Sequence, residues 1–137
     1  MVLESAQMLS TAHYIVDGRE GLYKPTHRNH PCSKWCRSTQ ENYKWLYSHF
    51  RALAMEYEYR YEKVHRTWEK LGEVLALVPS IRETVLEEFP QAMGDVYEKC
   101  KGVCSVKAYR EYYKMREKEI MMRWTKRLRP EWLGKKT

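Results

Sequence analysis

Apolar and aromatic side chains recur every three or four positions between residues 43 and 64, and this spacing constrains the fold most strongly. The run consists of Tyr43, Leu46, Tyr47, Phe50, Leu53, Ala54, Tyr57, Tyr61 and Val64. It predicts one long amphipathic helix. Ser38 is followed three residues later by Glu41, which is the capping-box spacing, so we expect this helix to begin there.

Other segments predict shorter helices. We expect a helix over residues 2–16 ended by Asp17 and Gly18, a loop over 21–30, and a helix starting at His30 and Pro31. Thr67 can cap a helix to about residue 77, residues 81–88 predict a brief helix, and Ser105 can cap a last helix over 106–128. Strand-like alternation is absent. The sequence therefore predicts an all-α, compact, single-domain bundle of four to six helices with irregular joins over residues 1–137, with 129–137 as a C-terminal tail.

Composition suggests the kind of partner. The 137 residues carry a formal charge of +7, and they include 11 Tyr and 5 Trp but only 2 Phe. Rings with a polar tip are preferred where a side chain must be half-buried and still form hydrogen bonds. A basic surface suits phosphate-bearing ligands, and it equally suits a soluble basic protein. No run approaches the ~18 apolar residues of a membrane span, and no signal peptide is apparent, so we expect a cytoplasmic protein without membrane contact.

Two pairs of cysteines have three intervening residues each. They are Cys32 with Cys36 and Cys100 with Cys104, and His27 and His30 lie near the first pair. Thiolates and imidazoles can complete a tetrahedral zinc site, but structural zinc sites usually have two residues between cysteines. We therefore expect free thiols, no bound metal and no cofactor.

Three cationic or titratable side chains share one face of the helix predicted after His30. His30, Lys34 and Arg37 are spaced i, i+4, i+7, and they lie near a helix start, where backbone amides also point outward. This pattern predicts a phosphate cradle. The alternative is a solvated basic face with His30 acting only as a cap.

Rings and polar groups elsewhere extend the candidate site. Glu56 and Arg60 can also form an ordinary i, i+4 ion pair on an outer face. The candidate ligand-binding residues are His30, Lys34, Trp35, Arg37, Asn42, Tyr43, Trp45, Glu56, Tyr59, Arg60, Lys63, His65, Gln91 and Arg110. No glycine-rich phosphate loop, zinc-protease motif or serine elbow occurs, so nothing demands an enzyme, although His30 or His65 with Glu56 could serve acid–base chemistry.

Several motifs together resemble a widespread family of small phage-encoded helical proteins. They are Asn29-His30-Pro31, Asn42-Tyr43-x-Trp45-Leu46, Glu56-Tyr57-x-Tyr59-Arg60-Tyr61-x-Lys63-x-His65, Gln91-Ala92-Met93 and Ala108-Tyr109-Arg110-x-Tyr112-Tyr113. Some small phage proteins of this kind are anti-defence sponges, which bind the cyclic nucleotide signals of bacterial CBASS immunity without cleaving them, usually as homo-oligomers. The resemblance thus implies a cyclic nucleotide ligand, a homo-oligomer and the cytoplasm of a phage host.

The order of helices is also similar to the phage pyrimidine-dimer glycosylase (endonuclease V) family. There a helix-borne Glu, matched here by Glu4, acts with an N-terminal amine on damaged DNA. Members of that family carry an N-terminal strand and a Cys-Asp-Lys-His segment before the position of Val2, whereas this chain starts at Met1, and they have Gly where it has Glu62. These departures favour binding over catalysis. We therefore expect a nucleotide-sequestering protein, with a glycosylase-type DNA repair or DNA-modification enzyme as the alternative. A third alternative is a structural or host-interaction protein whose aromatic side chains belong only to the core.

Overall fold

The computed structural model describes residues 1–91, 105–116, 122 and 124–133. The chain divides into two units, Met1–Phe89 and Pro90–Thr137, and we describe each by itself. Five α-helices and two short 3₁₀ helices form the regular structure of the described residues, which contain no strand. The all-α prediction is confirmed. The prediction of a single domain over residues 1–137 remains a prediction.

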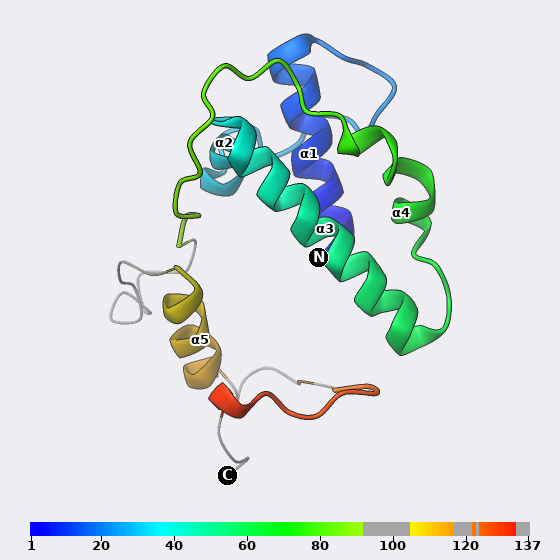
Figure 1. The fold of residues 1–137 in the computed structure, drawn as a ribbon, viewed down its shortest axis with the longest axis vertical. Coiled ribbons are helices and arrows are strands. Elements are labelled where there is room, and N and C mark those ends of the chain that lie inside the picture. Colours follow the sequence, from blue (N-terminus) through cyan, green and yellow to red (C-terminus); the bar gives the residue numbers. More distant parts are fainter. Residues whose placement is uncertain (92–104, 117–121, 123, 134–137) are drawn as a thin grey trace. The chain divides into compact units, whose positions relative to one another are not determined.

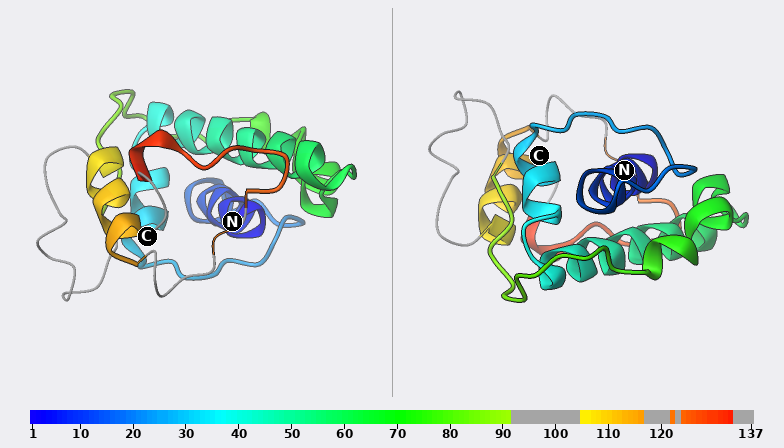
Figure 2. Two further views of the ribbon diagram at one scale, coloured as in Figure 1. Left: turned by 90° about the horizontal axis from the view of Figure 1, so that it is seen from below. Right: turned by 90° about the horizontal axis from the view of Figure 1, so that it is seen from above.

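The first unit is built around its N-terminal helix. Its elements are α1 (Val2–Asp17), α2 (Pro31–Cys36), α3 (Gln40–Tyr61), α4 (Arg66–Leu71) and the 3₁₀ helix η1 (Val74–Ala76). Helix α1 packs against α2, α3 and α4 (Figure 1). Figure 2 shows α1 nearly end-on, with α2 and α3 on different sides of it.

The predicted apolar run of α3 forms one wall of the core. Tyr43 and Phe50 are fully buried, and they face Leu9 and neighbouring small residues of α1 in one hydrophobic cluster. The Phe50 ring lies 5.3 Å from that of Trp68. The end of the run differs, because Tyr61 and Val64 are 52% and 46% exposed. Only the first two-thirds of the run therefore contributes to the core of this unit.

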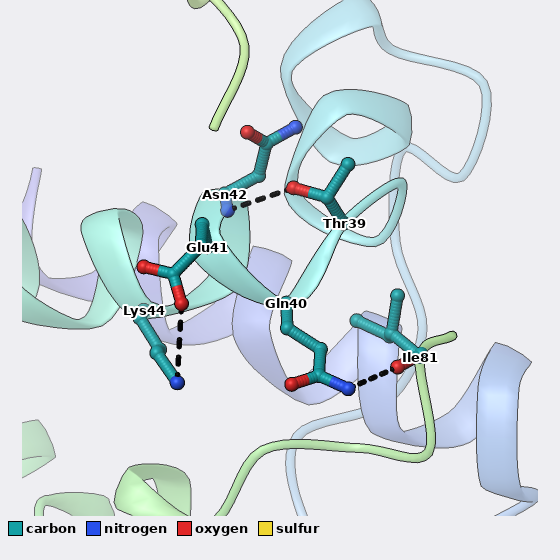
Figure 3. Close-up of polar contacts among 6 residues, drawn as sticks. All are labelled: Thr39, Gln40, Glu41, Asn42, Lys44 and Ile81. Carbon is teal, nitrogen blue, oxygen red and sulfur yellow. Dashed lines mark hydrogen bonds and ion pairs between the residues drawn. The ribbon is translucent and has the colours of Figure 1, made fainter. Parts of the chain in front are cut away.

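Helix boundaries follow the predicted signals with two corrections of the capping residue. Gly18 ends α1 with φ 66°, and Pro31 begins α2 after the His30 cap, as predicted. Helix α3 is capped by Thr39 rather than by Ser38, since the Thr39 hydroxyl accepts from the Asn42 N–H at 3.0 Å (Figure 3). The Ser38 hydroxyl donates to the Lys34 carbonyl instead.

The second correction concerns α4. Thr67 is not its cap, because the His65 ring nitrogen Nδ1 accepts from the Thr67 N–H at 3.1 Å, so the helix begins one residue before Thr67. It ends at Leu71, and only the 3₁₀ turn η1 follows before residue 77. The Thr67 side chain could cap a helix, but the His65 imidazole is the acceptor that caps α4 in the structure.

The predicted helix over residues 81–88 is wrong. This segment has no helical hydrogen bonding and runs as an extended strand-like tube beside α2 and the start of α3 (Figure 1). Side chains of α3 satisfy its backbone, since the Gln40 amide donates to the Ile81 carbonyl at 2.6 Å (Figure 3). The Gln40 backbone N–H also donates to the Glu83 carbonyl. These tertiary bonds replace the ones that a helix would form.

The second unit contains α5 (Ser105–Arg116) and the 3₁₀ helix η3 (Glu131–Leu133). The predicted helix over 106–128 is too long, because residues 122 and 124–128 are not helical. A turn occurs there instead, in which the Arg127 N–H donates to the Trp124 carbonyl and Lys126 has a positive φ of 59°. Ala108 is buried against Tyr109 and Tyr112 in a small cluster of this unit.

Glu62 ends α3 in a conformation that suits glycine. Its φ is 57°, in the left-handed region, and its N–H donates to the Glu58 carbonyl. A Cβ in this region costs about 1 kcal/mol. We expect Glu62→Gly to be more stable to urea than Glu62→Ala by about 1 kcal/mol, since both variants lack the carboxylate and only the second keeps a Cβ. Equal midpoints for the two variants would contradict this assignment.

Candidate functional site

The most unusual charge pattern of the first unit lies in residues 24–37, which we call the basic segment. It contains four Lys or Arg residues and two His, and no Asp or Glu occurs between Gly21 and Gln40. Its cations are Lys24, Arg28, Lys34 and Arg37. None of the four has a carboxylate partner within the described part of the chain. The segment is therefore a surface of positive charge without local compensation.

Contacts with neutral groups hold part of this segment in place. The Arg37 guanidinium donates to the Ser33 hydroxyl at 3.2 Å and to the Arg28 carbonyl at 2.8 Å. The Arg28 guanidinium carbon lies 5.9 Å from the centroid of the Tyr14 ring. Arg37 thus ties α2 to the preceding loop, whereas Lys24 and Lys34 are exposed on the surface.

His30 is the N-terminal cap of α2, as the simpler interpretation predicted. Its Nδ1 accepts from the Cys32 N–H at 3.1 Å, so it caps α2. The predicted cradle of outward-pointing amides is therefore partly wrong, because this amide is already bonded. The ring is exposed. His30 and Arg37 flank the six-residue helix α2 and are not helical themselves, so the predicted common helical face with Lys34 does not form.

Trp35 and Trp45 meet at the junction of α2 and α3. Their ring centroids are 5.7 Å apart in an edge-to-face arrangement. Trp35 is 8% exposed and its indole N–H donates to the Glu87 carbonyl, so it is a packing residue. Trp45 is 36% exposed, and within the described residues its indole N–H has no acceptor. Trp45 is the ring that a ligand can reach.

Two further rings contact Trp45. His49, one helical turn later, stacks on it with centroids 5.2 Å apart and planes 13° apart. Phe89, from the end of the extended segment, lies 5.0 Å away at 32°. Neither residue is among the candidate ligand-binding residues predicted from the sequence. The spacing of Trp45 and His49 could have identified the first, whereas Phe89 approaches only because residues 81–89 are extended.

Asn42 is fully buried and all its amide groups are bonded. Its Nδ2 donates to the Trp35 carbonyl at 2.9 Å and to the Glu87 carboxylate at 3.2 Å. Its Oδ1 accepts from the Glu87 N–H at 2.9 Å. In this state Asn42 holds the extended segment against α3, and it is not available to a ligand.

Tyr43 belongs to the interior and not to a ligand surface. It is fully buried, its hydroxyl donates to the Leu75 carbonyl at 2.7 Å, and His13 Nε2 lies 2.8 Å from the same oxygen. Stacking of a base on Tyr43 is therefore excluded in this structure. The buried pair links α1 and α3 to the turn that follows α4.

The remaining candidates of the first unit lie at the other end of α3. Glu56 and Arg60 form an ion pair of 2.7 Å, as the simpler interpretation expected. Tyr59 and Lys63 are exposed, and His65 caps α4. A rise of about 1.5 Å per residue places Asn42 and Arg60 about 27 Å apart along the helix axis. The candidates of this unit therefore form two separate groups.

Two candidates belong to the second unit. Gln91 is half-buried. Arg110 is exposed, and its guanidinium carbon lies 5.6 Å from the centroid of the Trp132 ring. Arg110 thus forms a cation–π contact within its own unit.

Glu4 is the acid that the glycosylase alternative requires, and it lies on the exposed first turn of α1. Its carboxylate is 2.5 Å from the Met1 amine, and both groups are largely exposed. The hydrogen bond from this amine lowers the pKa of the Glu4 carboxyl. The group is therefore ionised at neutral pH, which suits a base or an electrostatic partner and not a proton donor.

The remaining features of the first unit are its two cysteines and an open depression beside α1. Cys36 is fully buried, and burial raises the pKa of its thiol, while Cys32 is half-buried. Cys100 and Cys104 lie outside the described residues. Where the structure describes the chain, no three His, Cys, Asp or Glu side chains are grouped as metal ligands. An open depression of about 540 Å³ lies beside α1, lined by Leu3, Gln7, Tyr23, Lys24, Pro25 and Thr26.

One buried and one half-buried histidine predict how stability depends on pH. Burial lowers the pKa of His13 and of His49 from the ordinary value of 6.5. The unfolded chain then binds more protons just below pH 6.5, so stability is full above that pH and falls as the pH decreases through it. We expect a lower urea midpoint at pH 5.5 than at pH 7.5, with a smaller difference in His13→Gln. A midpoint that is equal or higher at pH 5.5 would contradict the neutral state of these rings.

None of the helices in the described ranges is long and apolar enough to cross a membrane. No family model matches the chain, and no curated protein or solved structure matches it.

Proposed function

We propose that this protein binds a phosphate-bearing nucleotide and sequesters it without cleavage. The specific ligand that we propose is a cyclic di- or oligonucleotide. The phosphates contact the basic segment and a base contacts Trp45. The observation that carries the proposal is the set of four Lys and Arg residues with no carboxylate partner in the described part of the chain. The cyclic form of the ligand, the phage origin and the absence of cleavage come from the resemblance described above.

Three cations elsewhere in the described chain have a carboxylate beside them. Lys44 pairs with Glu41 at 3.2 Å, Arg60 with Glu56 at 2.7 Å and Lys114 with Glu111 at 3.2 Å. A phosphate that approaches these positions meets a neighbouring carboxylate. At the basic segment it meets only positive charge and neutral donors, so binding there gains more electrostatic free energy.

The aromatic part of the site adjoins the cationic part through α2. Lys34 and Trp35 are consecutive, and the Trp35 ring touches that of Trp45. Stacking on an aromatic side chain is worth about 1–3 kcal/mol per base. One nucleotide can thus place its phosphate on the basic segment and its base at Trp45.

The group at the far end of α3 enters the proposal only through a second copy of the chain. Glu56, Tyr59 and Arg60 lie about 21–27 Å from Asn42 along the axis, and Lys63 follows the end of α3. One small ligand cannot contact both groups. In a homo-oligomer the far group of one copy can meet the basic segment of another. We therefore include an oligomer in the proposal.

The test is calorimetric titration of the full chain with cyclic di- and trinucleotides, a linear dinucleotide and inorganic phosphate. We expect saturable binding of at least one cyclic nucleotide, weaker binding of phosphate alone, and affinity that falls as salt rises. Mass spectrometry of ligand released by heating should recover it intact. Absence of binding across the panel would refute the proposal, and a cleaved product would refute sequestration.

One further assay separates binding from the glycosylase alternative. That alternative expects nicking of ultraviolet-irradiated plasmid DNA by the wild-type chain and loss of nicking in Glu4→Gln. Our proposal expects no nicking by either protein. Nicking that disappears in Glu4→Gln would establish the enzyme instead.

A further inference from the structure

Residues 81–89, which we call the strap, cover the ring and the amide that a base would use. Five hydrogen bonds join them to α2 and α3, through Gln40, Asn42 and Trp35. Most of the strap faces solvent, since residues 82–88 are all exposed. Its two ends, Ile81 and Phe89, pack against the core of the first unit. The residues between them are therefore held by hydrogen bonds and not by burial.

The pattern of bonds between Asn42 and Glu87 has a chemical counterpart in nucleic acids. Asn42 accepts from the Glu87 N–H at 2.9 Å and donates to the Glu87 carboxylate at 3.2 Å. A donor beside an acceptor is what the N6 and N7 edge of adenine presents, and asparagine is its usual bidentate partner. Guanine presents two acceptors at the same edge, so it cannot replace the Glu87 N–H.

The orientation of the Asn42 amide does not depend on the strap alone. The second hydrogen of Nδ2 is donated to the Trp35 carbonyl at 2.9 Å, a group of α2. This bond fixes which end of the amide is the acceptor after the strap has moved away. Asn42 is therefore preset to accept from one group and donate to its neighbour.

Phe89 is the residue of the strap that lies beside the Trp45 ring. Its ring lies 5.0 Å from that of Trp45 and is tilted by 32° relative to it. Asn42 and Trp45 are three residues apart on α3, so their side chains are neighbours on one face. His49 stacks on Trp45 and Phe89 lies beside it. Phe89 is the one of the two that belongs to the strap, so opening of the strap exposes more of the Trp45 ring to a base.

We infer that the junction of α2 and α3 recognises adenine, and that Glu87 and Phe89 of the strap occupy this site until the ligand displaces them. This inference rests on the proposed function and adds to it the base and an internal competitor. Binding then requires the strap to open. Weakening the strap without touching α2 or α3 should strengthen binding of an adenine ligand.

The test compares cyclic di-adenosine monophosphate with cyclic di-guanosine monophosphate by calorimetry on three proteins. They are the wild type, Phe89→Leu, which keeps an apolar side chain but removes the ring, and Val85→Ala, a control at a strap position 68% exposed. We expect the adenine ligand to bind at least about tenfold more tightly than the guanine ligand. We expect Phe89→Leu to improve adenine affinity by about threefold or more, and Val85→Ala to leave it unchanged.

Each other outcome overturns a defined part of the inference. Equal affinity for the two ligands, or a preference for guanine, refutes adenine recognition and leaves the proposed function standing. Unchanged or weaker adenine binding by a folded Phe89→Leu refutes the competitor role of the strap. If no protein binds either ligand, both the inference and the proposed function fail for these ligands.

Hydrogen exchange gives a readout that needs no ligand. The Glu87 N–H donates to the Asn42 Oδ1 in the closed strap. Its hydrogen should exchange with solvent much faster than the amide hydrogens in the middle of α3, because the strap opens without global unfolding. Exchange of the Glu87 amide as slow as that of the Phe50 amide would show that the strap opens only on unfolding. That result would refute the displacement step.

Discussion

Replacing Phe50 by alanine should lower the free energy of unfolding by about 3–5 kcal/mol. Phe50 is fully buried at the centre of the α3 wall, and its ring lies 5.3 Å from Trp68 and 6.1 Å from Tyr47. The truncation removes apolar area and leaves a cavity bordered by large rings that cannot all move into it. Urea unfolding followed by circular dichroism measures the change.

Met55 supplies the matched control on the same helix. It is 40% exposed, so Met55→Ala should change the free energy of unfolding by less than about 0.5 kcal/mol beyond its small effect on helix propensity. A loss in Met55→Ala as large as that in Phe50→Ala would mean that α3 presents a different face to α1. The packing described here would then be wrong.

Reversing the charge of Lys34 should weaken binding of the cyclic nucleotide by about 10- to 100-fold. A hydrogen bond to a charged group contributes about 1.5–3 kcal/mol, and the introduced carboxylate adds repulsion to a phosphate. Lys34 is exposed and has no carboxylate partner in the ranges that the structure describes, so Lys34→Glu should leave the fold intact. Calorimetry of the variant gives the affinity.

Lys44→Glu is the control for this charge reversal. It changes the net charge by the same amount, but Lys44 lies outside the basic segment and pairs with Glu41. We expect an affinity loss of less than about threefold, from the long-range field alone. Equal losses in the two variants would show that overall charge, and not the basic segment, attracts the ligand.

The sequence was informative where local rules decide the structure. The spacing of apolar residues predicted α3, and Gly18 and Pro31 predicted the end of α1 and the start of α2 correctly. It also predicted the Glu56–Arg60 ion pair as one of two alternatives. Each of these features depends on residues within about one helical turn of each other.

The errors arose where distant residues override local preference. Residues 81–88 have a helix-compatible composition, yet Gln40, Asn42 and Trp35 bond their backbone in an extended form. The sequence predicts that Asn42 contacts a ligand, whereas in the structure Glu87 occupies its amide. A sequence alone does not show which segment will meet a buried amide.

The sequence does not separate rings that pack from rings that can contact a ligand. Lys34 is exposed and Arg37 is half-buried, but Tyr43 and Trp35 are buried by the same aromatic character that suggested stacking. A tyrosine in an apolar stripe packs inward when its hydroxyl finds a buried acceptor, here the Leu75 carbonyl. Trp45, which also lies beside the stripe, kept an exposed face.

The central claim, that the basic segment and Trp45 form one nucleotide site, is tested most directly by nuclear magnetic resonance of the ¹⁵N-labelled chain. The Trp45 indole N–H and the backbone amides of residues 24–37 should shift together on titration with the cyclic nucleotide that binds in calorimetry. Resonances of amides at the far end of α3 report separately on the proposed oligomer, and they shift only where the ligand joins two copies. Shifts that leave Trp45 and the basic segment unchanged and cluster elsewhere would contradict the account.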